Sequence, residues 1–343
     1  MIRGWHWVVL LLAFNAVPLY AQQALTGPAS QPAIGLQSNP TLDRAETLLK
    51  SGQWKAAHDL IVPWLKANPK APDRDRGVFL LAEVYWVNGD RVRAFYHCDE
   101  LMDNYPESRL FFSALQLQYD IADAYLNGFK DTFLGMRVVP MTDEAIEMLF
   151  RIQERSPGSP LAERALKRTA DYYFNTSQFD LASAAYGAFA RSYPRSHDVP
   201  QVRLRQALSS LAQFRGPRFD TTPLIDARAQ FREIEQRYPE LAADADVAGW
   251  IDRIDADLAR KAYVTGDFYT RTNQPKGAAY LFRYVIETYP NSHEATLARA
   301  ALATLPASAL TGPPPPPSNP EAAATQPAGA GGAGTPGGSE RRP

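Results

Sequence analysis

The chain shows a repeating pattern of hydrophobic and polar positions that starts at Thr41. Apolar or small residues recur every three or four positions, which is typical of helices with one buried side. Most of the helical segments come in pairs, and each pair closes on a turn that contains proline. Copies of this turn are Asn68-Pro69, Tyr105-Pro106, Ser156-Pro157, Tyr193-Pro194, Tyr238-Pro239 and Tyr289-Pro290. The recurrence predicts an array of helical hairpins rather than one globular core.

The windows that end at four of these prolines align with the 34-residue tetratricopeptide unit. Small residues fall at unit positions 8 and 20, where the two helices of a hairpin must approach closely. These pairs are Ala45 and Ala57, Ala82 and Ala94, Ala170 and Ala182, and Gly266 and Ala278. Position 24 carries Cys98, Tyr186 or Phe282 in three windows, and we expect these side chains to fill the groove beside the small residues.

Three intervals between the turns are longer than the unit allows. We assign one excess to a partly apolar loop, Gly128–Pro140, and another to a loop at Arg215–Thr222. The third interval has no turn signal, so we expect a lengthened helix from about Ala242 to Thr272. In repeat proteins such insertions often mark the binding face.

The sequence therefore predicts an all-α, tetratricopeptide-like solenoid of about six helical hairpins over residues 41–305, with disordered termini. Residues 22–40 contain no charged residue and are rich in Gln, Pro, Ala, Ser and Gly, which favours a disordered linker. Residues 306–343 contain the run Pro313–Pro317 followed by Ala, Gly and Pro, and we expect a disordered tail with a local polyproline II stretch.

Residues 1–21 have the pattern of a secretory signal peptide, with Arg3 before the apolar run Val8–Ala16 and a possible cleavage site after Ala21. An uncleaved membrane anchor is the alternative. The lone cysteine, Cys98, is far from this site, so a lipidated N-terminus is not expected. The predicted location is the periplasm; association with the outer membrane through a partner is what the family resemblance of the last three hairpins implies.

Composition limits the possible chemistry. The formal net charge is -1, which gives no case for nucleic-acid binding. A single cysteine allows no internal disulfide, and the five histidines show no ligand spacing. We find no catalytic motif, no metal site and no cofactor motif, so the chain is predicted not to be an enzyme. Five aspartates between Asp244 and Asp257 would spread around a helix and are interpreted as a solvated face.

The last three hairpins resemble the BamD family of outer-membrane protein assembly factors. The resemblance covers Leu161–Ala298 and is carried by the segments Tyr193-Pro194-x-Ser196, Asp220-Thr221-Thr222, Arg237-Tyr238-Pro239, Asp257-Leu258-Ala259, Phe268-Tyr269 and Tyr289-Pro290-Asn291-Ser292. The family carries a lipidated cysteine that has no counterpart here, and the Pro-rich tail is not part of the family pattern.

The resemblance implies a non-enzymatic scaffold that binds the barrel-forming subunit of the assembly machinery and unfolded outer-membrane proteins. It also implies contact through basic residues near the end of the long helix. We therefore propose Arg271, Arg283, Tyr269, Arg215 and Arg218 as partner-binding residues. The alternative function is a periplasmic tetratricopeptide adaptor for cell division, wall synthesis or polysaccharide export.

Other residues favour structural roles. Cys98 is expected to be a buried, unreactive thiol. Tyr85, Tyr173 and Tyr269 occupy repeat positions at which packing is commoner than ligand stacking. Arg203 and Arg205 join Arg215 and Arg218 in a basic cluster, for which a solvated face is the simpler interpretation.

Overall fold

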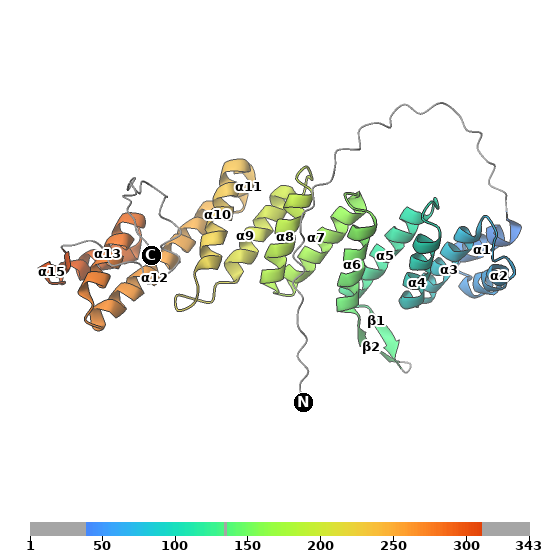
Figure 1. Ribbon diagram of the computed structural model, residues 1–343, viewed down its shortest axis with the longest axis horizontal. Helices are drawn as coiled ribbons and strands as arrows, with labels where there is room; N and C mark the ends of the chain where they lie inside the picture. Colours follow the sequence, from blue (N-terminus) through green and yellow to red (C-terminus); the bar gives the residue numbers. More distant parts are fainter. Residues whose placement is uncertain (1–38, 134–135, 311–343) are drawn as a thin grey trace, which may run out of the picture.

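The computed structural model describes residues 39–133 and 136–310, and within these ranges the chain forms a row of helical hairpins (Figure 1). Successive helices pack chiefly on their neighbours in sequence, so the row extends from α1 at one end to α15 at the other. The predicted solenoid of six hairpins is confirmed. The paired helices are α1 Pro40–Lys50 and α2 Trp54–Ala67, α3 Arg74–Asn88 and α4 Arg91–Asn104, α5 Phe111–Leu126 and α6 Thr142–Arg155, α7 Pro160–Asn175 and α8 Phe179–Ser192, α9 Val199–Ala212 and α10 Thr222–Arg237, and α12 Val247–Arg271 and α13 Pro275–Thr288.

The small residues at positions 8 and 20 are buried between the helices of each hairpin, as the template requires. Ala82, Ala94, Ala170 and Ala182 are fully buried, and the same holds for Ala45, Ala57 and Ala278. The position-24 side chains Cys98, Tyr186 and Phe282 are at most 1% exposed. The core is therefore divided into clusters along the row, each shared by neighbouring helices, as expected for a repeat array.

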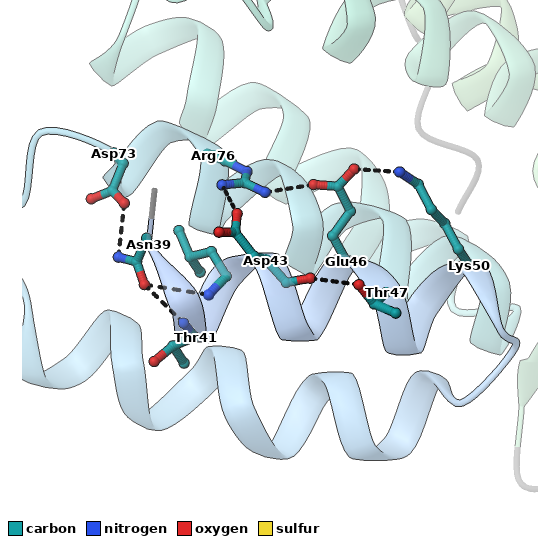
Figure 2. A network of polar contacts seen from close by, with 9 residues as sticks. Asn39, Thr41, Asp43, Glu46, Thr47, Lys50, Asp73 and Arg76 are labelled. Atoms are coloured by element: carbon teal, nitrogen blue, oxygen red, sulfur yellow. Dashed lines mark hydrogen bonds and ion pairs between the residues drawn. The ribbon is translucent and has the colours of Figure 1, made fainter. Parts of the chain in front are cut away.

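Ion pairs connect the first helices of neighbouring hairpins on the same side of the row. Figure 2 shows the first of these links, in which Arg76 of α3 donates to Asp43 at 2.7 Å and to Glu46 at 2.5 Å, both on α1. Lys50 completes the network by donating to Glu46 at 2.6 Å, and this hydrogen bond and that from Arg76 lower the pKa of Glu46. The link fixes the first hairpin, which packs on one neighbouring hairpin within the part of the chain that the structure describes.

The same link recurs further along the row. Arg168 of α7 donates to Asp123 of α5 at 2.5 Å, and Arg205 of α9 donates to Asp171 of α7 at 2.8 Å. Each arginine thus reaches back to the first helix of the preceding hairpin. Because these groups are partly exposed, each pair contributes modestly on its own, but the geometry fixes the rotation between neighbouring hairpins.

The insertion between α5 and α6 is a β-hairpin, not the irregular loop that the sequence suggested. Strand β1, Lys130–Phe133, pairs antiparallel with β2, Met136–Pro140, and the register shifts between Asp131 and Thr132. The β-branched residues of Arg137-Val138-Val139 favour extended backbone, which explains the strand.

The lengthened helix is present, but it begins later than predicted. A separate short helix, α11 Pro239–Asp244, precedes α12, and the break lies at Asp246, which has a left-handed backbone with φ +50°. No glycine or proline marks this break, and an aspartate tolerates the left-handed region better than most residues. Hence α12 starts at Val247 and not at Ala242.

The helical part also extends beyond the predicted limit at residue 305. After α14, His293–Ala303, the short helix α15, Ala307–Leu310, packs on α13. Ala309 is 6% exposed, so part of the predicted tail belongs to the packed structure. The proposed signal peptide, most of the linker and the polyproline run lie outside the described residues.

Candidate partner-docking surface

The loop between α9 and α10 and the second half of α12 lie next to each other. The loop turns at Gly216, whose φ of +115° is a conformation that other residues rarely adopt. It ends where the carboxylate of Asp220 accepts from the backbone N–H of Thr222 at 3.0 Å, at the start of α10. The ammonium of Lys261 on α12 donates to the carbonyl of Phe219. This contact fixes the loop against the long helix.

Large apolar side chains are exposed on both elements at this junction. Phe219 is 55% exposed, and on α12 Val264 is 45% and Phe268 is 50% exposed. Residues 261, 264, 268 and 271 are spaced three or four apart, so they lie on one side of α12. We call Phe219, Lys261, Val264, Phe268 and Arg271 the docking stripe. Exposed apolar groups with a charged rim are typical of protein interaction sites.

Three of the five proposed partner-binding arginines and tyrosines are at or near this surface. Arg271 belongs to the stripe; its side chain is 67% exposed and pairs with Asp267 at 3.1 Å, one turn earlier on the same helix. Arg215 and Arg218 are exposed in the loop that carries Phe219. The structure thus brings together two segments more than forty residues apart in sequence, through the Lys261 contact.

The other two candidates have packing roles. The ring of Tyr269 packs with the core between α12 and α13, where a Cβ added at Gly277 would lie 3.3 Å from it. Arg283 donates to the carbonyl of Leu310 at 2.7 Å and so fixes α15 on α13. Neither side chain joins the docking stripe.

The basic cluster proposed around the loop is not assembled as a unit. Arg205 pairs with Asp171 of α7, and Arg203 lies 3.9 Å from Glu233 of α10. Their guanidinium groups therefore connect α9 to its two neighbours, while Arg215 and Arg218 remain exposed on the loop. Their acidic partners, Glu233 and Asp171, lie on other helices, so the local sequence could not identify them.

A cavity of about 410 Å³ is lined by residues of α8, of the end of α9 and of α10. The lining is mainly polar and includes Asp180, Ser183, Ser210, Gln213, Asp226 and Gln230. Its floor is a hydrogen-bonded chain in which Ser210 lies 3.0 Å from Ser183 and donates to Gln230 at 3.1 Å.

The remaining candidate residues serve the fold. Cys98 is fully buried, and burial raises the pKa of its thiol well above the usual range. Tyr85 stacks on His97 with ring centroids 5.4 Å apart, and Tyr173 packs in the core between α7 and α8. Asp255 forms a two-contact pair with Arg228, which joins α12 to α10.

Among the described residues there is no group of three or more metal-binding side chains, and none of the helices there is long and apolar enough to cross a membrane. The sequence reasoning did not identify Phe219, Lys261, Val264 or Phe268. The exposure of Val264 and Phe268 could have been predicted from the sequence, because both are apolar residues outside the repeat positions that face the core. Their juxtaposition with Phe219 depends on the fold.

Comparison with known proteins shows a family likeness in the second half of the array. Residues 141–308, just under half of the chain, match the family model YfiO, described as outer membrane lipoprotein. The outer membrane protein assembly factor BamD of Caulobacter vibrioides is 24% identical over 147 residues, which are 43% of this chain and 48% of that protein. BamD of Rickettsia prowazekii is 23% identical over 150 residues, 44% of this chain and 60% of that protein. The chain thus spans about half to three fifths of these relatives.

Matches among solved structures are tetratricopeptide repeat proteins. One from Parabacteroides merdae is 14% identical, with coverage of 77% of this chain and 96% of that chain and a TM-score of 0.35. A thermophilic protein of Thermus thermophilus is 19% identical, with coverage of 62% and 97% and a TM-score of 0.28. The docking stripe lies within residues 141–308, the region of this chain that is similar to the outer membrane lipoprotein family.

Proposed function

We propose that this chain is a non-enzymatic scaffold for the assembly of β-barrel proteins in the outer membrane. Support comes from the likeness to the family model and to the BamD relatives, from the repeat architecture, and from a docking stripe that lies inside the matched region. The partner would be the barrel-forming subunit of the assembly machinery, and the chain would reach the membrane through this subunit. The location is the periplasmic side of the outer membrane.

The docking stripe carries this proposal most directly. Phe219, Val264 and Phe268 expose apolar surface, and burying this surface against a partner would favour binding. Aromatic side chains commonly contribute much of the binding energy at protein interfaces. Lys261 and the loop residues Arg215 and Arg218 add positive charge near these apolar groups, while Arg271 is paired with Asp267. Such charges favour acidic groups on the partner and set its orientation. The loop need not order on binding, because Lys261 already fixes it to α12.

A second role follows for the polar cavity between α8 and α10. Its carboxylates and amides can exchange hydrogen bonds with the backbone of an extended polypeptide, so we propose it as a contact point for unfolded barrel segments. A volume of about 410 Å³ is within the range of small binding pockets and suits one or two residues rather than a folded domain.

The test is affinity capture of the full chain's partners from detergent-solubilised envelope, with identification by mass spectrometry. Recovery of the barrel-forming subunit with its periplasmic domains is the expected result. Phe268→Ser together with Arg271→Ala should abolish this recovery while the helical content measured by circular dichroism stays unchanged. Recovery of division, wall or export proteins alone would instead assign the chain to another envelope complex.

A further inference from the structure

The cavity lined by α8, the end of α9 and α10 carries negative charge. Its lining includes the carboxylates of Asp180, Asp220 and Asp226 and contains no lysine, arginine or histidine. The Asp220 carboxylate accepts from the backbone N–H and from the hydroxyl of Thr222, each at 3.0 Å. Asp180 and Asp226 are exposed, and neither forms an ion pair within the part of the chain that the structure describes. No basic residue of the lining therefore balances the charge of these two aspartates.

The neutral polar groups of the lining use most of their donor hydrogens inside the protein. Ser210 donates to Gln230 at 3.1 Å, so Ser183, whose hydroxyl lies 3.0 Å away, donates to Ser210. The amide nitrogen of Gln213 donates to two backbone carbonyls, each at 3.2 Å. Among these side chains the amide nitrogen of Gln230 is the donor that remains. The lining thus offers mainly hydrogen-bond acceptors, which match a cationic group with several N–H donors and no acceptor.

Two exposed aliphatic side chains lie one helical turn from the lining. Leu181 of α8 is 43% exposed and Ile225 of α10 is 44% exposed. Leu181 precedes the lining residue Ala184 by three positions, and Ile225 follows the lining residue Thr222 by three. Because residues three apart are neighbours on a helix surface, the acidic cavity has an apolar group beside it on each of the two helices. Such exposed apolar groups beside polar ones are typical of peptide and protein contacts.

We propose that this cavity binds a basic side chain, lysine or arginine, of an extended polypeptide segment that has apolar residues on both sides of it. The cation pairs with Asp180 and Asp226 and donates to the hydroxyl and amide oxygens of the lining, and such charge-assisted hydrogen bonds are the stronger ones. Side chains two positions apart in an extended chain point to the same face, so apolar residues at these positions lie over Leu181 and Ile225.

This binding mode rests on the proposed role of the cavity as a contact point for unfolded barrel segments, and it specifies the side chain that such a segment contributes. Among the described residues no three acidic, histidine or cysteine side chains are arranged to hold a metal ion, so the three aspartates do not form a metal site. The cation that fits the cavity is therefore an organic one.

Fluorescence anisotropy with the purified full chain tests the proposal. The probes are two labelled peptides, one with the sequence Leu-Ser-Lys-Ser-Leu between glycine-serine ends and one with glutamine in place of the lysine. The lysine peptide should bind with a Kd at least tenfold lower than that of the glutamine peptide, because the acceptors pair with a charged donor. Added sodium chloride should reduce this difference. Asp180→Asn combined with Asp226→Asn should bring the two Kd values to within twofold of each other.

A second double variant, Asp244→Asn combined with Asp252→Asn, is the matched control. Both residues are exposed aspartates, on α11 and α12, that do not line the cavity, and the change in net charge is the same. The control should keep the preference for the lysine peptide. Far-UV circular dichroism verifies that both double variants retain the helical content of the wild type.

Three results would contradict the binding mode. Equal binding of the two peptides by the wild type overturns the preference for a basic side chain but leaves the proposed peptide contact in place. Loss of the preference in the control as well would show that overall charge, and not the cavity, attracts the lysine peptide. Binding of neither peptide at millimolar concentration overturns the basic side chain and the peptide contact together, whereas docking of the barrel-forming subunit is tested separately through the docking stripe.

Discussion

Gly266 of α12 lies directly against the ring of Phe282 of α13: a Cβ added at residue 266 would come within 2.7 Å of the ring's Cε1 atom. This contact joins the two helices of the last hairpin at the positions where the repeat template requires a small residue and an aromatic one. Phe282 is 1% exposed, so its ring has little room to move away.

Gly266→Ala is therefore expected to destabilise the protein. Overpacking typically costs about 1–3 kcal/mol, whereas alanine gains up to about 1 kcal/mol over glycine in a helix, so a net loss on the order of 1 kcal/mol should remain. Urea denaturation followed by circular dichroism measures this difference. Adding Phe282→Leu should recover part of the loss, and Val264→Ala, on the exposed side of the same helix, should change little.

The docking stripe yields a prediction about binding without a change in stability. Lys261→Ala removes the contact that fixes the Phe219 loop to α12, so capture of the partner should weaken several-fold even though Lys261 need not touch the partner. Binding is measured with the purified partner subunit by calorimetry. Tyr96→Ser serves as control, because Tyr96 is an exposed aromatic residue, like Phe219, but lies outside the region that the family model matches. Equal losses of partner binding in the two variants would contradict a specific role of the docking stripe.

The ion pair between Arg228 and Asp255 is expected to stabilise the junction between α10 and α12. Its two contacts measure 2.6 and 2.9 Å, and both side chains are mostly buried. Arg228→Ala should cost about 1–3 kcal/mol of unfolding free energy, as is usual for hydrogen bonds to charged groups. Arg237→Ala, which removes an exposed pair within α10, should cost no more than about 0.5 kcal/mol. A double-mutant cycle with Asp255→Asn measures the pair itself.

Two glutamates near the first junction should give opposite dependences on pH. Burial, and then the charge of Glu46, raises the pKa of Glu83, whereas hydrogen bonds from Lys50 and Arg76 lower the pKa of Glu46. A raised pKa in the folded state means that stability is lost as pH rises through that pKa. A lowered pKa means that stability is lost as pH falls through it.

Glu83→Gln is therefore expected to raise the melting temperature at pH 7 and to lose this advantage in acid below the ordinary glutamate pKa. Glu46→Gln should lower the melting temperature at pH 7, with a smaller deficit in acid. Thermal melts at several pH values distinguish the two. If the melting temperatures of both variants differed from the wild type in the same direction at pH 7, the opposite pKa shifts of Glu83 and Glu46 would be contradicted.

Cys98 should be unreactive in the folded protein. The thiol is fully buried, so a reagent cannot reach the sulfur. Burial also raises the pKa of the thiol, so the reactive thiolate does not form at neutral pH. Reaction with Ellman's reagent should follow the unfolding transition in denaturant. Fast reaction under native conditions would show that the hairpin of α3 and α4 opens locally.

The spacing of small and aromatic residues along the chain was sufficient to predict the hairpins, their number and the buried positions of Ala82, Ala94 and Cys98. Helical periodicity is a local property, and repeat units pack mainly on neighbours in sequence, so local patterns determine most of this fold. The same logic missed the break at Asp246 and the helix at Ala307–Leu310, because packing against the array decides both.

The docking stripe was only partly accessible from sequence. Arg271, Arg215 and Arg218 were proposed from a family resemblance, while Phe219 and Phe268 become one surface only when Lys261 connects a loop to a helix about forty residues away. Pairing of Arg205 with Asp171, and of Arg283 with Leu310, likewise required the neighbouring element to be in place. Sequence alone determined the hairpins through local periodicity, and the tertiary structure decided which charges are neutralised and which apolar groups remain exposed, because both depend on contacts between separate hairpins.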